Sequence, residues 1–126
     1  MATWLLKTEP STYSIADLQR EKRTRWDGVK NAAALLNLRK MMVGDQVLLY
    51  HTGSEKAVVG IARVFVADTK DGVITLEYEK TLRHPVPLSA IKADKAFKEF
   101  ALVKISRLSA MPVSAEHHKR ILSMGA

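Results

Sequence analysis

Hydrophobic residues recur along much of the chain at the intervals of strands. The runs Thr3–Thr8 and Gln46–His51 each predict one strand. Residues 57–67 are hydrophobic on both faces, which is typical of a central strand. Residues 73–82 alternate, and a short run at 102–105 predicts one more strand. The inward side chains of the alternating run are expected to be Ile74, Leu76 and Tyr78.

Helical spacing separates and follows these strands. Ser14, Asn31 and Ser114 each precede a helical stretch and are expected to be N-caps. Asp17 lies where it completes a capping box with Ser14. The helix after Asn31 is expected to reach residue 41, with Leu35, Leu38 and Met42 on its packed face. Two short helical turns are expected at 88–91 and 96–100.

Glycine and proline mark the boundaries of the sheet. Asp71-Gly72 predicts a hairpin turn, and Pro85 and Pro87 are expected to end strand pairing. Gly60, inside the central run, indicates a bulge or a close approach by another segment. With no linker or repeat, residues 1–126 are expected to form one α+β domain. The simplest arrangement is a mixed sheet bent into a small barrel, with short helices at its ends.

Residues 24–31 (Thr-Arg-Trp-Asp-Gly-Val-Lys-Asn) place an aromatic ring among cations and beside a turn. A charged loop at 21–25 is expected before Trp26, and Asp27-Gly28 is expected to turn the chain after it. One interpretation is a corner of the hydrophobic core, where Trp commonly lies. The other is a platform on which a nucleobase stacks while nearby cations contact phosphates. The sequence leaves both interpretations open.

Composition excludes several classes of protein. Hydrophobic residues make up 47% of the chain, which is in the globular range. There are no cysteines, which excludes disulfides, thiolate catalysis and zinc or iron–sulfur sites with cysteine ligands. No hydrophobic run has the length of a membrane span. We therefore expect a soluble intracellular protein without an export signal, in the cytoplasm, with the nucleoid or the nucleus as alternatives according to the host cell.

The chain is basic, with 20 Lys+Arg against 13 Asp+Glu and a net charge of +7. Such a charge attracts polyanions, of which nucleic acid is the most abundant in cells, although many basic proteins bind no specific partner. No phosphate-binding glycine loop, hydrolase elbow or metalloprotease helix is present. His117 and His118 are adjacent and cannot face one metal ion on a helix, so no metal site and no cofactor are expected. His51 and Glu9 leave acid–base catalysis by a hydrolase as a less favoured alternative.

Several segments together resemble the EVE domain, a family of the PUA-like superfamily. They are TWLLKTEP at 3–10, TRWDGVKN at 24–31, NLR at 37–39, VGD at 43–45, LYH at 49–51, VGIA at 59–62 and RLS at 107–109. The resemblance covers nearly the whole chain and implies a PUA-like pseudo-barrel. It also implies a non-enzymatic reader of nucleic acid, which accepts a methylated or hydroxymethylated base flipped into an aromatic-walled pocket. The more distant YTH domain, a reader of N6-methyladenine, is similar around the same segments.

The resemblance also implies roles for individual residues. Those expected at the base pocket are Lys7, Thr8, Glu9, Trp26, Asn31, Tyr50, His51, Thr52 and Ser109. Those expected to contact phosphates are Arg23, Arg25, Lys30, Arg39 and Arg107. The expected partner is modified DNA first and RNA second, with the protein acting as a monomer and without a membrane.

The chain also departs from the family pattern. The family motif Tyr-Gln-Ala-Arg-Asn after Asn31 is replaced by Ala32, Ala33, Ala34, Leu35 and Leu36, and a family Gln by Met111. The insertion after the third strand is reduced to residues 68–72. These changes leave the identity of the ligand open. The alternative to a reader is an interaction module, or a small-molecule-binding module with a divergent pocket.

Overall fold

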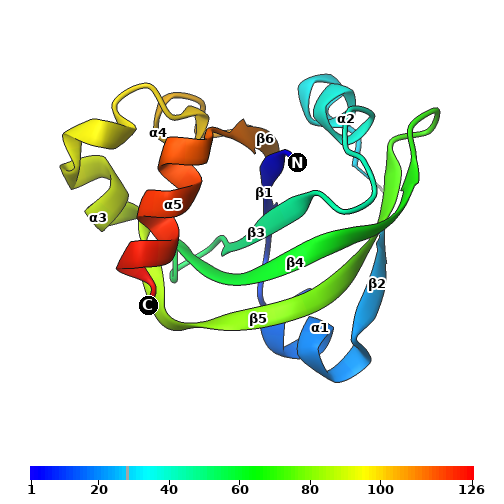
Figure 1. Ribbon diagram of the computed structural model, residues 1–126, viewed down its shortest axis with the longest axis horizontal. Helices are drawn as coiled ribbons and strands as arrows, with labels where there is room; N and C mark the ends of the chain where they lie inside the picture. Colours follow the sequence, from blue (N-terminus) through cyan, green and yellow to red (C-terminus); the bar gives the residue numbers. More distant parts are fainter. Residues whose placement is uncertain (28) are drawn as a thin grey trace.

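The computed structural model describes residues 1–27 and 29–126 (Figure 1), so the expected Asp27-Gly28 turn lies partly outside the described residues. Its strands are β1 (Thr3–Thr8), β2 (Arg23–Trp26), β3 (Gln46–His51), β4 (Ala57–Asp68), β5 (Val73–Pro87) and β6 (Ala110–Val113). Its helices are α1 (Ile15–Glu21), α2 (Ala32–Leu38), α3 (Leu88–Ala93), the 3-10 turn η1 (Lys95–Phe97), α4 (Ala101–Lys104) and α5 (Ala115–Met124).

The strands form one mixed sheet in the order β2-β5-β4-β3-β1-β6. Strands β1 and β3 are parallel, and the other neighbours are antiparallel. Helix α2 follows the edge strand β2 in sequence but packs beside the opposite edge, where Asn37 Nδ2 donates to the Ala110 carbonyl at 2.8 Å. This crossing joins the two edges of the bent sheet and confirms the expected α+β pseudo-barrel with flanking helices (Figure 1).

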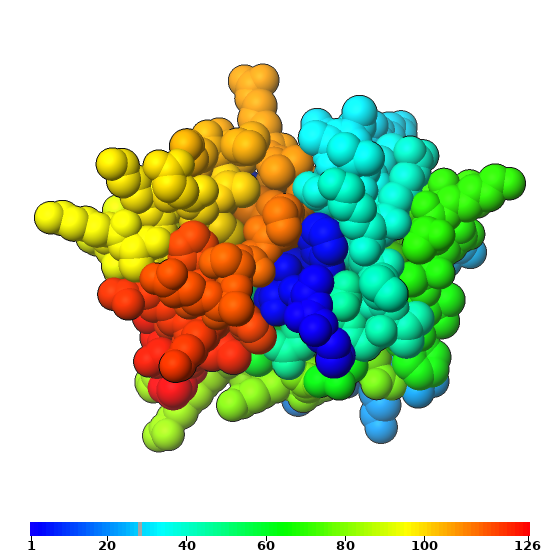
Figure 2. Space-filling model, turned by 45° about the horizontal axis from the view of Figure 1, so that its top comes forward, coloured from blue at the N-terminus to red at the C-terminus, as the bar shows by residue number. Residues whose placement is uncertain are grey.

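The helices cover different parts of the barrel. Helices α3, α4 and α5 gather at one end, whereas α1 lies near β2 at the other (Figure 1). Figure 2 shows the N-terminal residues at the surface between α5 and the segment that contains α2. No helix within 1–27 or 29–126 combines the length and hydropathy needed to cross a membrane.

Gly60 allows α1 to pack tightly on the central strand β4. The pairing of β4 with β5 shifts register between Val58 and Gly60. A Cβ atom on Gly60 would lie 2.3 Å from Cδ1 of Ile15 and 3.0 Å from the Lys80 carbonyl oxygen. Real Cβ atoms do not approach that closely, so both the bulge and the close approach expected from the sequence are confirmed.

Side chains cap three helices as expected. Asp17 N–H donates to Ser14 Oγ at 3.2 Å, and the Asp17 carboxylate accepts from the Ser14 backbone, which completes the capping box. Asn31 Oδ1 accepts from the Ala34 amide at 3.0 Å. Ser114 Oγ accepts from the His117 amide at 3.1 Å. These bonds satisfy amides that the first helical turn leaves without partners.

Two expectations about strands were wrong. Residues 102–105 belong mainly to the short helix α4, whose Leu102 is buried. Four mostly hydrophobic residues do not distinguish a strand from one helical turn. Strand β5 also continues through Pro85 and Pro87, because β2 pairs only with residues 74–77 and leaves that edge of β5 open. Proline is tolerated at an open strand edge, where its missing N–H has no partner to lose.

Two further expectations need correction. Residues 23–26 form the edge strand β2 and not a charged loop, since Arg23 and Arg25 face solvent while the backbone pairs with β5. Met42 was expected on the packed face of a helix ending at residue 41. Helix α2 ends at Leu38, and Met42 is 67% exposed, whereas Met41 is fully buried.

Candidate functional site

The C-terminal ends of the parallel strands β1 and β3 bring most of the expected base-pocket residues together. Lys7 lies opposite Tyr50, and Thr8 lies opposite His51. The Thr52 amide donates to the Thr8 carbonyl at 2.9 Å, and Thr52 Oγ1 donates to Glu9 Oε2 at 3.2 Å. The Lys7 amide donates to the Ser109 carbonyl at 2.9 Å. Seven of the nine residues expected at the base pocket thus lie near one another, and their contact with a base stays a prediction: Lys7, Thr8, Glu9, Tyr50, His51, Thr52 and Ser109.

Trp26 ends β2 opposite Ile74 and is partly buried against the core. Its indole meets the ring of Tyr13 edge to face, with centroids 6.3 Å apart and planes at 83°. Thr8 Oγ1 donates to the Tyr13 carbonyl at 2.8 Å, so Tyr13 connects Trp26 to the end of β1. The ring therefore packs on the core and stays partly accessible, and its use as a platform for a base stays a prediction.

Tyr13 is a residue of this region that the sequence analysis missed. Its hydroxyl donates to Glu21 Oε1 at 2.7 Å. Burial raises the pKa of Tyr13, so the hydroxyl stays protonated as a donor at neutral pH. Tyr13 lies in the irregular segment between β1 and α1, where no periodicity distinguishes an aromatic with a role from an ordinary surface residue.

Asn31 is exposed, and the structure gives it a capping role at α2 through its side-chain oxygen. Its contact with a base stays a prediction. The replaced family positions behave differently from one another. Ala32, Ala33 and Leu36 are exposed on α2, whereas Met111 is fully buried on β6 opposite Leu5. The change at position 111 therefore lies in the core.

His51 is buried, and both ring nitrogens are engaged. Its Nε2 accepts from the Ile15 amide at 3.1 Å, and Nδ1 lies 2.7 Å from Glu55 Oε1. Since Nε2 accepts, Nδ1 carries the proton and donates it to Glu55. Glu9 instead bonds Thr52, so within the described residues no hydrogen bond joins Glu9 to His51. The pair required by the hydrolase alternative is not assembled, and His51 anchors the start of α1.

The expected phosphate contacts fall into two groups. Arg23 pairs with Glu77 at 2.9 Å, with its guanidinium 3.8 Å from the ring centroid of Phe65. Arg25 pairs with Asp27 at 3.4 Å. The side chains of Lys30, Arg39 and Arg107 are exposed to solvent. Arg23 and Arg25 would have to exchange an internal carboxylate for a phosphate, whereas the other three face solvent directly.

The C-terminal histidines do not share a ligand. His117 Nε2 lies 2.7 Å from the Ala96 carbonyl oxygen, and His118 Nδ1 lies 3.1 Å from Thr3 Oγ1. Their different partners agree with the angle between neighbouring residues on a helix. Within the part of the chain that the structure describes, no three His, Cys, Asp or Glu residues gather as a metal site.

A cavity of about 280 Å³ opens beside the end of β1. We call it the lysine pocket, and its lining residues are Lys7, Tyr50, Thr52, Gly53, Lys56, Leu88, Lys92, Leu102, Val103 and Ser106. Trp26 is not among them. Three residues expected at the base pocket, Lys7, Tyr50 and Thr52, thus border a cavity that Trp26 does not line. Lys56 and Lys92 could not be predicted from the sequence, because they come from separate segments and carry no shared motif.

Comparison with known proteins places these features in a family. A sequence model of the EVE domain matches residues 2–124. Thymocyte nuclear protein 1 of Danio rerio is 25% identical over 96% of this chain and 71% of its own length. The chain spans only 30% and 42% of the chicken and human proteins of that name.

Solved structures share the whole fold. A protein of Rhodopseudomonas palustris, solved by NMR, is 36% identical and has a TM-score of 0.91, with 99% of this chain and 93% of that chain covered. The human THYN1 protein, solved in complex with DNA containing 5-methylcytosine, is 22% identical and has a TM-score of 0.90, with 99% and 98% covered. At 22% identity, the second likeness shows the fold.

Proposed function

Because the chain belongs to the EVE domain family, we propose that it is a non-enzymatic reader of nucleic acid that takes one modified base against Trp26. The family match agrees with the resemblance of the sequence segments, and a relative of the same fold was solved with methylated DNA. Modified DNA is the first candidate partner and RNA the second. Within this proposal, the base is methylated or hydroxymethylated and leaves its helix to reach the ring.

The observation that carries the proposal is the partly accessible indole of Trp26, held edge-on by Tyr13. An aromatic ring fixed in advance loses little conformational freedom when a base stacks on it. Stacking contributes about 1–3 kcal/mol per base, which offsets much of the few kcal/mol needed to flip a base. Thr8, Glu9 and Asn31 would then contact base edges, while Lys30, Arg39 and Arg107 meet phosphates.

The departures on α2 shape the expected specificity. Ala32 and Ala33 are exposed where the family carries an aromatic and an amide, and Leu35, where the family carries a cation, is partly buried. Small apolar side chains at these positions offer no hydrogen bonds to a base edge. We therefore expect this chain to discriminate mainly by the size and stacking of the base, and less by its hydrogen-bonding edge.

Titration with matched oligonucleotides tests the proposal. The set carries cytosine, 5-methylcytosine or 5-hydroxymethylcytosine at one position, and adenine or N6-methyladenine in a second series, at two salt concentrations. A reader binds one modified member more tightly at both salt concentrations, whereas contact through charge alone weakens equally for all members as salt rises. Equal affinity for every member would overturn the proposal.

Replacing the indole ring tests whether selectivity for a modified base depends on Trp26. Trp26→Ala is expected to weaken binding of the preferred oligonucleotide about fivefold or more, given about 1–3 kcal/mol for stacking. Trp26→Phe is the matched control, because it keeps a smaller ring and should retain part of the affinity. Circular dichroism shows whether each variant stays folded. A folded Trp26→Ala protein with unchanged affinity would exclude stacking on this ring.

A further inference from the structure

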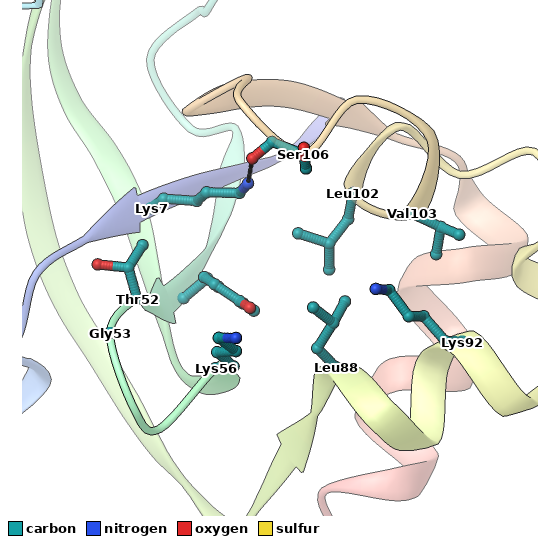
Figure 3. A pocket seen from close by; sticks show the side chains of 10 residues that line it. Lys7, Thr52, Gly53, Lys56, Leu88, Lys92, Leu102, Val103 and Ser106 are labelled. Carbon is teal, nitrogen blue, oxygen red and sulfur yellow. Dashed lines mark hydrogen bonds between the residues drawn. The ribbon is translucent and has the colours of Figure 1, made fainter.

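The lysine pocket is formed by separate parts of the chain. Lys7 enters from β1, Lys56 from the loop between β3 and β4, and Lys92 from α3 (Figure 3). Their side chains border the same hollow from different sides, while Leu88, Leu102 and Val103 form its wall toward the helices. A hollow that joins cations and an apolar wall suits a small organic anion.

The pocket carries uncompensated positive charge. Among the described residues that line the pocket there are three lysines and no Asp or Glu. Lys7, Lys56 and Lys92 take part in none of the ion pairs found among the described residues. Some arginines elsewhere on the surface do pair with carboxylates, such as Arg63 with Glu79 at 2.6 Å. Positive charge is therefore available to a ligand here.

Backbone contacts hold two of the lysines in place. Lys7 Nζ donates to the Ser106 carbonyl at 2.8 Å and lies 5.7 Å from the ring centroid of Tyr50. Lys56 has a φ of +47°, in the left-handed region that non-glycine residues seldom adopt. Its carbonyl accepts from the Leu88 amide at 2.8 Å, which ties the loop to α3. The Lys7 ammonium and the backbone of Lys56 are thus held in place before a ligand arrives.

We propose that the lysine pocket binds the terminal phosphate of a nucleotide, with the sugar and base against the apolar wall. A terminal phosphate carries nearly two negative charges near neutral pH and matches three ammonium groups better than a carboxylate or an internal phosphodiester, each with one. At about 280 Å³ the cavity suits one small molecule. Trp26 does not line this pocket, and the inference does not depend on the proposed function.

Burial of Lys7 agrees with this assignment. Burial lowers the pKa of Lys7, because the ammonium loses part of its hydration. A bound phosphate would return a charged partner to that ammonium. A terminal phosphate can belong to a free mononucleotide or to the phosphorylated 5′ end of a nucleic-acid strand. The experiment distinguishes these two ligands.

NMR titration of the ¹⁵N-labelled protein tests the site with three probes: deoxycytidine 5′-monophosphate, deoxycytidine and inorganic phosphate. The monophosphate is expected to shift the amides of Gly53, Lys56 and Ser106 and leave the Trp26 indole signal in place. Deoxycytidine should have no effect at the same concentration, and inorganic phosphate should bind at least several-fold more weakly than the monophosphate.

Paired charge variants provide the control. Lys56→Gln/Lys92→Gln removes two exposed pocket cations and is expected to weaken the monophosphate at least tenfold. Lys80→Gln/Lys119→Gln removes the same charge from β5 and α5 and should change affinity less than twofold. Equal losses in both variants, or shifts spread over the whole surface, would overturn the site in favour of diffuse charge.

Oligonucleotides with and without a 5′-phosphate distinguish the two sources. If the phosphorylated strand shifts the pocket amides and its unphosphorylated twin does not, the pocket recognises a strand end. If only free monophosphate shifts them, the pocket is a mononucleotide site; both results support the proposal. Absence of shifts with every phosphate probe would overturn it. Trp26→Ala leaves this test intact, so failure of base reading and failure of the pocket are separable.

Discussion

The region around Trp26 and the lysine pocket differ in how their cations are held. Near Trp26, Arg23 and Arg25 are already paired with Glu77 and Asp27. In the lysine pocket, Lys7 and its neighbours have no carboxylate partner among the described residues. The net charge of +7 is therefore unevenly available. The first region favours recognition of shape by an aromatic ring, and the second favours recognition of the charge of one terminal phosphate.

The largest expected effect is on the first region, through the packing of α1. Gly60→Ala places a Cβ 2.3 Å from Ile15 and should push α1 away from β4, disturbing the Tyr13–Trp26 contact. Overpacking of this kind costs about 1–3 kcal/mol of unfolding free energy. Chemical denaturation measures it, and adding Ile15→Ala should recover part of the loss in a double-mutant cycle. Additive losses would show that the overlap with Ile15 is not the cause.

A smaller effect is expected from the contact that orients the indole. Tyr13→Ala removes an edge-to-face pair worth about 0.5–1.5 kcal/mol, so oligonucleotide binding should weaken several-fold. Phosphate binding in the lysine pocket should not change. Tyr13→Phe keeps the ring but loses the hydrogen bond to Glu21, and it is expected to bind oligonucleotides like the parent protein. If both variants bind alike, the ring of Tyr13 does not orient Trp26.

These regions were not equally predictable from sequence. Local patterns identified the strands β1, β3, β4 and β5, the caps at Ser14, Asn31 and Ser114, and the close approach at Gly60, because each depends on neighbouring residues or on one backbone property. The resemblance identified the cluster at the ends of β1 and β3. That residues 1–126 form one domain, and the roles of individual site residues, stay predictions.

What the sequence missed depends on distant partners. Residues 23–26 became a strand because their backbone pairs with β5, which their charged side chains do not indicate. The hydrolase alternative needed His51 to pair with Glu9, but His51 binds Glu55 and the Ile15 amide, since the loop after β3 returns a carboxylate to it. The lysine pocket arises only when β1, the loop at Lys56 and α3 are brought together.

Removing the carboxylate partner of Arg25 should make a cation near Trp26 available to phosphate, with little change in stability. Asp27→Asn removes the partner of exposed Arg25, and an exposed pair contributes only about 0.2–1 kcal/mol. Oligonucleotide affinity should rise about twofold and depend more steeply on salt, because one more cation meets phosphate. Glu116→Gln on α5 is the control for net charge alone. An equal rise in both variants would assign the effect to overall charge.

The smallest expected effect concerns the protonation of Lys7. Its pKa is lowered by burial in the folded protein, so the unfolded chain holds this proton more tightly. At neutral pH the partly buried charge of Lys7 lowers the free energy of unfolding. This loss of stability becomes smaller as pH rises from the lowered pKa of the folded protein toward the ordinary value of 10.5, because Lys7 loses its proton in that interval. Lys7→Met lacks this penalty.

The difference in melting temperature between Lys7→Met and the parent should therefore become less positive as pH rises through that interval. Loss of the hydrogen bond to Ser106 changes the melting temperature by a similar amount at every pH in the interval. The slope of the melting-temperature difference with pH is therefore the informative quantity. Inorganic phosphate bound in the lysine pocket should flatten the slope, because it favours the charged amine and returns the pKa toward its ordinary value. An unchanged slope with saturating phosphate would place that anion away from Lys7, leaving Lys7 a buried cation without a ligand.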